Sequence, residues 1–153
     1  MSAGVHVRMA LRDGWEEMGD PSTSPAPAIR RRYRRDGRVL AALSLEVLDP
    51  EGATPAEFAA AASTPPAEAR PWRRSVVVEA DADPVRVVVH DLDGARTGPD
   101  APPALRRTAT LTWFLSPDVC LQLSLVADDL LVIGDLGEAV RELADTVDWE
   151  VLA

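Results

Sequence analysis

Two consecutive stretches of alternating apolar and polar residues near the C-terminus constrain the fold of this chain most. Residues 105–115 alternate apolar residues with arginine and threonine, and residues 119–125 alternate apolar residues with cysteine, glutamine and serine. A period of two is typical of strands that bury one face, and Ser116, Pro117 and Asp118 between the stretches read as a turn. The sequence therefore predicts an antiparallel strand pair with one apolar face and no obvious catalytic group. The apolar positions are Leu105, Ala109, Leu111, Trp113, Leu115, Val119, Leu121, Leu123 and Leu125.

Further strands and two helices are expected around this pair. Thr54-Pro55-Ala56-Glu57 is typical of a helix start, with Thr54 as the N-cap and Glu57 three residues later. A second helix is expected from Asp135, with apolar residues at helical spacing up to Val147. The remaining expected strands are residues 6–11, 29–35, 39–48, 75–80 and 85–92. The sequence thus predicts an α+β fold: a twisted, mostly antiparallel sheet of about six or seven strands flanked by two or more helices, as an α/β/α sandwich.

The expected hairpin of residues 29–48 turns around Asp36 and Gly37. A two-residue turn would pair Tyr33 with Leu40 and place the apolar sets of the two strands on opposite faces. A three-residue loop with Gly37 left-handed would pair Tyr33 with Val39 and bring the two sets onto one face. Because the apolar residues of paired strands are expected on one buried face, we predict the three-residue loop.

Composition limits the classes of function. The 153 residues suit one domain over 1–153, with flexible loops at 19–28 and 94–104. A net charge of −9 argues against nucleic acid or an anionic membrane surface as partner. The single cysteine cannot form an internal disulfide, so the chain does not require an oxidising compartment. No apolar run is long enough to insert into a membrane, and a cytoplasmic location is therefore expected. All 16 basic residues are arginine, which excludes lysine-dependent chemistry, and no cofactor or metal site is expected.

The best candidate binding surface is the arginine-rich strand 29–35. Alternation places Arg30, Arg32 and Arg34 on the face away from Tyr33, where forked guanidinium groups suit an acidic protein partner or another anion. We expect Tyr33 to contribute to this site, together with Trp72 and Arg73. Two other interpretations remain open: the arginines keep an edge strand soluble, or they pair with acids of the same chain.

The most enzyme-like string is His90-Asp91-Leu92-Asp93-Gly94, in which His90 and a loop carboxylate would be the acid–base pair of a hydrolase-like enzyme. A strand that ends in an acidic turn explains the same residues. Asp91 and Asp93 resemble the start of a calcium loop but lack its later glutamate. Cys120 lies within a strand with no cation near it in sequence, which predicts a small core residue rather than a nucleophile.

The chain resembles the Mog1/PsbP-like fold group, in particular small actinobacterial members related to the LpqN-type lipoproteins. Asp13-Gly14-Trp15, the helix start at Thr54 to Phe58, the segment from Glu138 to Trp149 and the order of elements carry the resemblance. It implies a noncatalytic binding or assembly factor and transfers no catalytic residue.

These observations together predict a noncatalytic cytosolic accessory module that recognises another protein, of the assembly, secretion-associated or immunity type, with a homo-oligomer possible. One alternative is a protein that binds a small apolar ligand in a cavity between the sheet and the C-terminal helix, lined by Trp113, Leu123 and Val140. The other alternative is the His90 enzyme.

Overall fold

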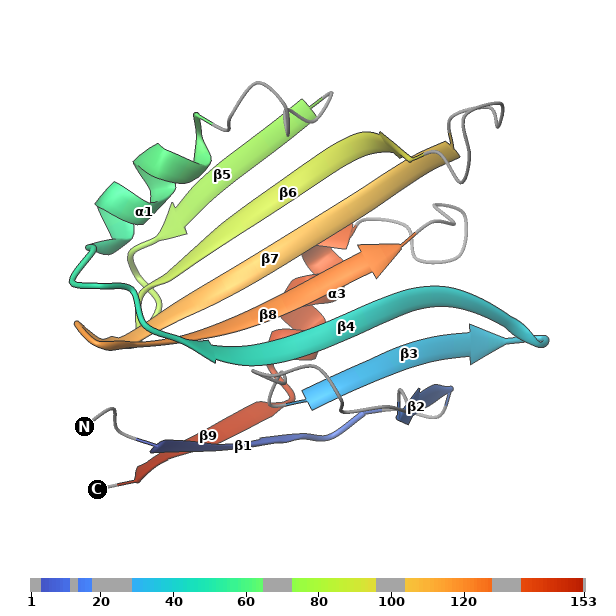
Figure 1. Ribbon diagram of the computed structural model, residues 1–153, viewed down its shortest axis with the longest axis horizontal. Helices are drawn as coiled ribbons and strands as arrows, with labels where there is room; N and C mark the ends of the chain where they lie inside the picture. Colours follow the sequence, from blue (N-terminus) through green and yellow to red (C-terminus); the bar gives the residue numbers. More distant parts are fainter. Residues whose placement is uncertain are drawn as a thin grey trace.

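The computed structural model describes residues 4–11, 14–17, 29–64, 73–95, 104–127 and 136–152. These residues form a seven-stranded sheet, a two-stranded sheet and two helices (Figure 1). The described pairings are antiparallel, so the predicted α+β class is confirmed. The elements are β1 (Gly4–Met9), β2 (Trp15–Glu17), β3 (Ile29–Arg35), β4 (Arg38–Leu48), α1 (Pro55–Ala62), β5 (Arg73–Glu79), β6 (Arg86–Ala95), β7 (Ala104–Ser116), β8 (Val119–Ala127), α3 (Leu136–Ala144) and β9 (Val147–Leu152).

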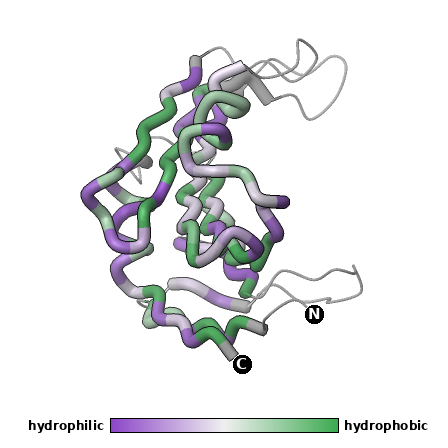
Figure 2. The backbone as a smooth tube through the Cα atoms, turned by 90° about the vertical axis from the view of Figure 1, so that its left-hand side faces the viewer, coloured by the Kyte–Doolittle hydropathy of each residue, from purple (hydrophilic) through white to green (hydrophobic). Residues whose placement is uncertain are grey.

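The large sheet has the order β2-β3-β4-β8-β7-β6-β5, and its two faces differ in chemistry. We call the side with Leu43, Leu111 and Leu123 the closed face, because α3 packs there. The opposite side, with Ser44, Thr110 and Ser124, is the open face. Alternation along each strand separates the two sets, and Figure 2 shows hydrophilic and hydrophobic residues alternating along the chain.

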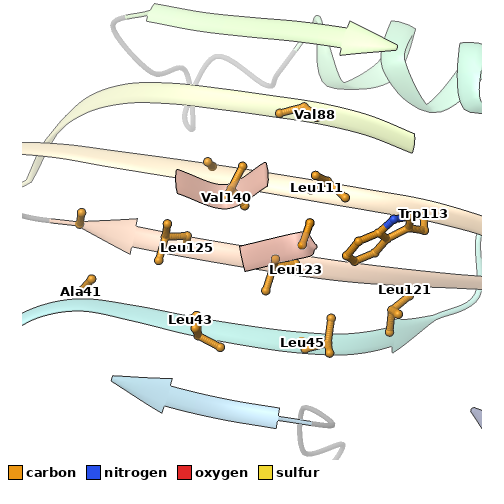
Figure 3. Close-up of a cluster of buried hydrophobic side chains, with 13 residues drawn as sticks. Ala41, Leu43, Leu45, Val88, Leu111, Trp113, Leu121, Leu123, Leu125 and Val140 are labelled. Atoms are coloured by element: carbon orange, nitrogen blue, oxygen red, sulfur yellow. The ribbon is translucent and has the colours of Figure 1, made fainter. Parts of the chain in front are cut away.

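The closed face carries the main core. The predicted apolar positions of β7 and β8 meet β4 in register, with Leu111, Leu123 and Leu45 in one row across three strands (Figure 3). Val140 and Ala144 of α3 pack on this row. Each fully buried leucine or valine stabilises the fold by about 1.5–3 kcal/mol relative to exposure, so this face supplies most of the apolar stabilisation.

The C-terminal segment differs from the prediction. The last helix ends at Ala144, and Val147 begins β9, which pairs with β1 in a separate two-stranded sheet. Thr146 closes the helix, since its amide and its hydroxyl both donate to the carbonyl of Leu143. Beyond Thr146 the apolar residues change to a period of two, which turns Val147 and Trp149 to the core, where the Trp149 and Trp113 rings lie 5.5 Å apart.

Helix α1 covers part of the open face. Its predicted capping box is present: the Thr54 hydroxyl accepts from the Glu57 amide, and the Glu57 carboxylate accepts from the Thr54 amide. Ala59 is buried against Val87 and Val89 of β6. The helix packs on β5 and β6.

The β3–β4 hairpin reaches the predicted face by a different route. A two-residue turn joins the strands, with positive φ angles of 53° at Asp36 and 77° at Gly37. The prediction of a three-residue loop was therefore wrong. A bulge then places Tyr33 opposite Ala41 rather than Val39. The bulge rather than the turn unites the apolar sets, because the extra residue shifts the register by one.

Some predicted boundaries also move. β6 extends to Ala95 and β7 begins at Ala104, so residues 94, 95 and 104 are strand residues rather than loop. Residues 19–28 and 96–103, and Asp135, lie outside the described residues.

Candidate functional site

The arginine row consists of Arg30, Arg32 and Arg34 on the open face of β3. As predicted from alternation, the three residues share a face; Arg30 lies opposite Ser44 and Arg32 opposite Ala42. Their Cα atoms repeat at roughly 7 Å, because every second residue of a strand faces the same way. The row therefore presents guanidinium groups along one line near the sheet edge.

Glu16 on β2 organises this row. Strand pairing sets Glu16 opposite Arg32, and a single carboxylate oxygen, Oε1, accepts from Arg32 Nε at 2.6 Å and from Arg34 Nε at 2.9 Å. Hydrogen bonds from Arg34 and then Arg32 hold the pKa of Glu16 below its ordinary value. The carboxylate stays ionised at neutral pH and fixes two guanidinium groups relative to each other. No strand was predicted at β2, although Gly14 and Trp15 were singled out as a motif.

Tyr33 supports the row from behind rather than joining it. Its ring lies on the closed-face side, with the Trp15 ring 5.3 Å away, and both residues pack against the main core. Gly14, at φ 102°, lies so close that a Cβ atom there would approach Tyr33 Cε2 to 2.5 Å. Tyr33 thus anchors β2, and through β2 it positions Glu16.

The rest of the predicted site is dispersed. Arg73 begins β5, at the edge of the sheet opposite β2, with four strands between β5 and β3. Its side chain and the whole of Trp72 lie outside the described residues. The expected proximity to β3 was wrong for Arg73, because the strand order is set by pairings that are distant in sequence.

Arg74, the neighbour of Arg73, holds α1 on the open face. Its Nε and one Nη donate to the two carboxylate oxygens of Asp91 at 2.7 and 2.8 Å, and the other Nη donates to the carbonyl of Ala62 at 2.7 Å. The hydrogen bonds to Asp91 raise the pKa of Arg74. This pair is structural: it ties the C-terminal end of α1 to β5 and β6.

Charge accumulates at the β2–β3–β4 end of the sheet. The segments 14–17 and 29–40 contain six arginines and three acidic residues, Glu16, Glu17 and Asp36, which gives a formal charge of +3. The chain as a whole carries −9. One prediction was therefore right in part: the arginines do pair with an acid of the same chain, but they outnumber it.

The described residues named for the enzyme alternative lie on different surfaces. His90 lies opposite Ala109 on the closed-face side of β6, whereas the Asp91 carboxylate binds Arg74 on the open face. His6 lies opposite Glu150 in the other sheet. Among the described residues, no group of three or more metal-binding side chains comes together.

Cys120 lies buried on β8, and burial raises the pKa of its thiol to about 11. It therefore remains a protonated thiol at neutral pH, as expected for a small core residue.

The three residues predicted to line an apolar ligand cavity are part of the main core. Trp113, Leu123 and Val140 are buried in one cluster, with Trp113 and Leu123 beside α3 in Figure 3. These side chains pack against one another between the sheet and the helix.

Comparisons with known proteins give a likeness of fold. No protein-family model and no curated protein matches the chain. Among solved structures, the chain is similar to the crystal structure of LpqN, which is involved in cell envelope biogenesis of Mycobacterium tuberculosis. The TM-score is 0.55 at 15% identity, over 99% of this chain and 86% of LpqN. The predicted relation to LpqN-type proteins is confirmed as a relation of fold, and the wider Mog1/PsbP-like group stays a prediction. Neither described helix is long and apolar enough to cross a bilayer.

Proposed function

We propose that this protein is a noncatalytic accessory module that recognises another protein through the arginine row, and that the partner surface is acidic. One observation carries the proposal: three arginines stand on one strand face, in a cluster of formal charge +3 within a chain of −9. A local field opposite in sign to the whole protein orients an acidic partner towards that one edge.

The geometry prepares the row for binding. Glu16 engages the Nε atoms of Arg32 and Arg34, and each guanidinium carries two further nitrogens, of which one on Arg34 also donates to the carbonyl of Gly37 at 3.4 Å. Forked donors match a carboxylate in two parallel hydrogen bonds. Because Glu16 already limits the rotamers of two arginines, less side-chain entropy is lost when a partner carboxylate binds.

The likeness to LpqN supports an accessory role, since LpqN is described as involved in cell envelope biogenesis. A fold by itself does not define a function, so the arginine row carries the argument. The cytoplasmic location predicted from the sequence is part of the proposal, and fractionation of producing cells tests it.

The test compares two charge-matched triple variants in affinity capture from the native host. One variant changes Arg30, Arg32 and Arg34 to glutamine; glutamine is chosen because glutamate would repel Glu16 and confuse binding with stability. The control changes Arg8, Arg106 and Arg141 to glutamine, which removes the same charge outside β3.

We expect partner recovery, measured by quantitative mass spectrometry, to fall at least tenfold for the β3 variant alone. Recovery should also fall as salt increases, because the attraction is electrostatic. Equal recovery with both variants would reject the arginine row as the recognition surface.

A further inference from the structure

A row of small hydroxyl side chains crosses the strands of the open face in register with Arg30. Strand pairing places Arg30 opposite Ser44, Ser44 opposite Ser124, and Ser124 opposite Thr110. Thr110 in turn lies opposite Val89, which is buried under α1. We call Ser44, Ser124 and Thr110 the hydroxyl strip; it runs from the arginines to the helix-covered part of the face.

Among the described residues, no helix packs on the open face between β3 and the part that α1 covers. From β3 to β6 the sheet spans four strand spacings, roughly 19 Å. α1 packs on β5 and β6 and lies beside β5 in Figure 1, whereas α3 packs on the closed face. A helix with its side chains is about 10–12 Å across, which is less than this span.

The chemistry of the strip suits close packing against a helix. Its residues are half-buried and small, as are Ala42 and Val126 on one flank, whereas Glu46 and Gln122 lie on the other flank. Because serine and threonine side chains are short, a helix can approach the strip to the usual helix–sheet distance. Their hydroxyl groups tolerate polar or apolar neighbours.

We infer that one acidic α-helix of the partner protein crosses the hydroxyl strip parallel to β3 and beside α1, with its carboxylates turned to the arginine row. This inference rests on the proposed function and adds to it the partner element and its position. Carboxylates four residues apart on a helix repeat at about 6 Å, close to the roughly 7 Å repeat of the arginines.

A helix fits this face better than an extended segment does. The strands beneath the strip are paired on both sides, so their amides and carbonyls are already bonded within the sheet. An extended chain laid flat on the strip would leave its own backbone groups without partners, whereas a helix satisfies its backbone internally.

The probe is a fluorescein-labelled, lactam-stapled helix of about 14 residues, roughly 21 Å long, with glutamate at every fourth position and alanine or serine elsewhere. Two matched peptides accompany it: a glutamine version, and an unstapled version of the same charge interrupted by proline. Fluorescence anisotropy measures affinity for the full chain, and amide chemical shifts locate the peptide.

We expect the stapled acidic helix to bind at least tenfold more tightly than either matched peptide. Amide shifts should concentrate in β4, β7 and β8. Equal binding of the proline-interrupted peptide would overturn the helix in favour of an extended acidic segment, and shifts confined elsewhere would overturn the position.

The decisive variant is Ser124→Trp, which fills the strip, with Ser75→Trp as its control at an exposed position of β5. Probe binding should weaken at least tenfold for Ser124→Trp only. Ser44→Trp blocks the same strip from β4 and replaces Ser124→Trp if that variant does not fold. Unchanged binding by a folded strip variant overturns the inference.

The proposed function has a separate outcome. If the arginine-row glutamine variant loses the native partner while Ser124→Trp retains it, recognition by the row stands and the helix on the strip does not. If both variants retain the partner, both ideas fail.

Discussion

The two faces of the seven-stranded sheet are built from the same strands but meet different surroundings. On β8, Leu121, Leu123 and Leu125 lie under α3 and the β1–β9 pair, and they are fully buried. The alternating Gln122 and Ser124 lie on the open face, which α1 covers over β5, β6 and, through Phe58 and Phe114, the end of β7. Adjacent residues of one strand thus serve different purposes, since the period of two sends them to opposite sides.

This difference separates stability from recognition. The closed face gains its free energy from leucine, valine and tryptophan side chains that pack against one another, so these residues are poorly suited to binding exchangeable partners. The open face keeps small polar side chains and a charged edge, which cost little to expose to water and can be covered by another protein. Substitutions on the closed face should therefore lower stability, whereas substitutions on the open face should weaken partner binding.

The largest expected effect is at Leu123. Leu123→Ala should lower the free energy of unfolding by about 3 kcal/mol, because it opens a cavity between the sheet and α3. Its neighbour Ser124 is the control: Ser124→Ala should change stability by about 0.5 kcal/mol or less. Urea unfolding measures both, and similar losses at the two positions would contradict the division of the faces.

Gly14→Ala comes next and tests the anchor of the arginine row. The added Cβ would collide with the Tyr33 ring and the φ of 102° is strained for alanine, so we expect a loss of about 2 kcal/mol. Gly37→Ala is the matched control, since φ there is also positive but nothing lies within 4 Å of the added Cβ, and about 1 kcal/mol is expected.

Thermal or urea unfolding gives the difference between the two glycine variants. An equal cost would mean that Tyr33 moves freely and does not fix β2. Trp15 fluorescence should also shift in Gly14→Ala if β2 is displaced.

Asp91→Asn tests how firmly α1 is held on the open face. The Arg74–Asp91 pair is mostly shielded, with side-chain exposures of 24% and 18%, and its loss should cost about 1 kcal/mol. The exposed pair of Arg8 and Asp148, at 72% and 73%, provides the control, and Asp148→Asn should be nearly neutral.

Hydrogen exchange supplies the second measurement for Asp91→Asn. The amides of α1 should exchange faster while those of β7 and β8 keep their protection. Unchanged exchange in α1 would show that the Phe58 and Ala59 contacts alone hold the helix.

The smallest effect concerns Glu16. Its pKa, followed by carboxyl chemical shifts, should lie below the ordinary value and rise towards it in Arg34→Gln, and also in Arg32→Gln. A lowered folded-state pKa means that the carboxylate stabilises the fold above the ordinary pKa and that this contribution is lost as pH falls through the lowered value. A Glu16 pKa unchanged by both substitutions would show that the bonds to the arginines do not persist in solution.

Local patterns were sufficient for much of the fold. The alternation in 105–125 predicted β7, the turn, β8 and their buried face, because a strand exposes every second residue to the same side. The capping box at Thr54 predicted the start of α1, because its hydrogen bonds join residues only three apart. The same alternation placed Arg30, Arg32 and Arg34 together.

Features that depend on distant partners were missed. β2 has three residues and no pattern of its own; it exists because β3 offers an edge and Tyr33 offers a ring for Gly14 and Trp15. The sequence predicted that the helical face extends to Val147, which instead begins β9, since a period of two over six residues indicates a strand only when β1 lies alongside.

The sequence by itself determined which residues face together and where two elements begin, because periodicity and capping act between neighbours in the chain. Only the tertiary structure decided that Glu16 meets the arginine row, that Arg73 lies at the other edge, and that α1 leaves the hydroxyl strip uncovered. Strand order and helix placement follow from the total burial of apolar surface across the whole chain, and no short segment encodes that sum.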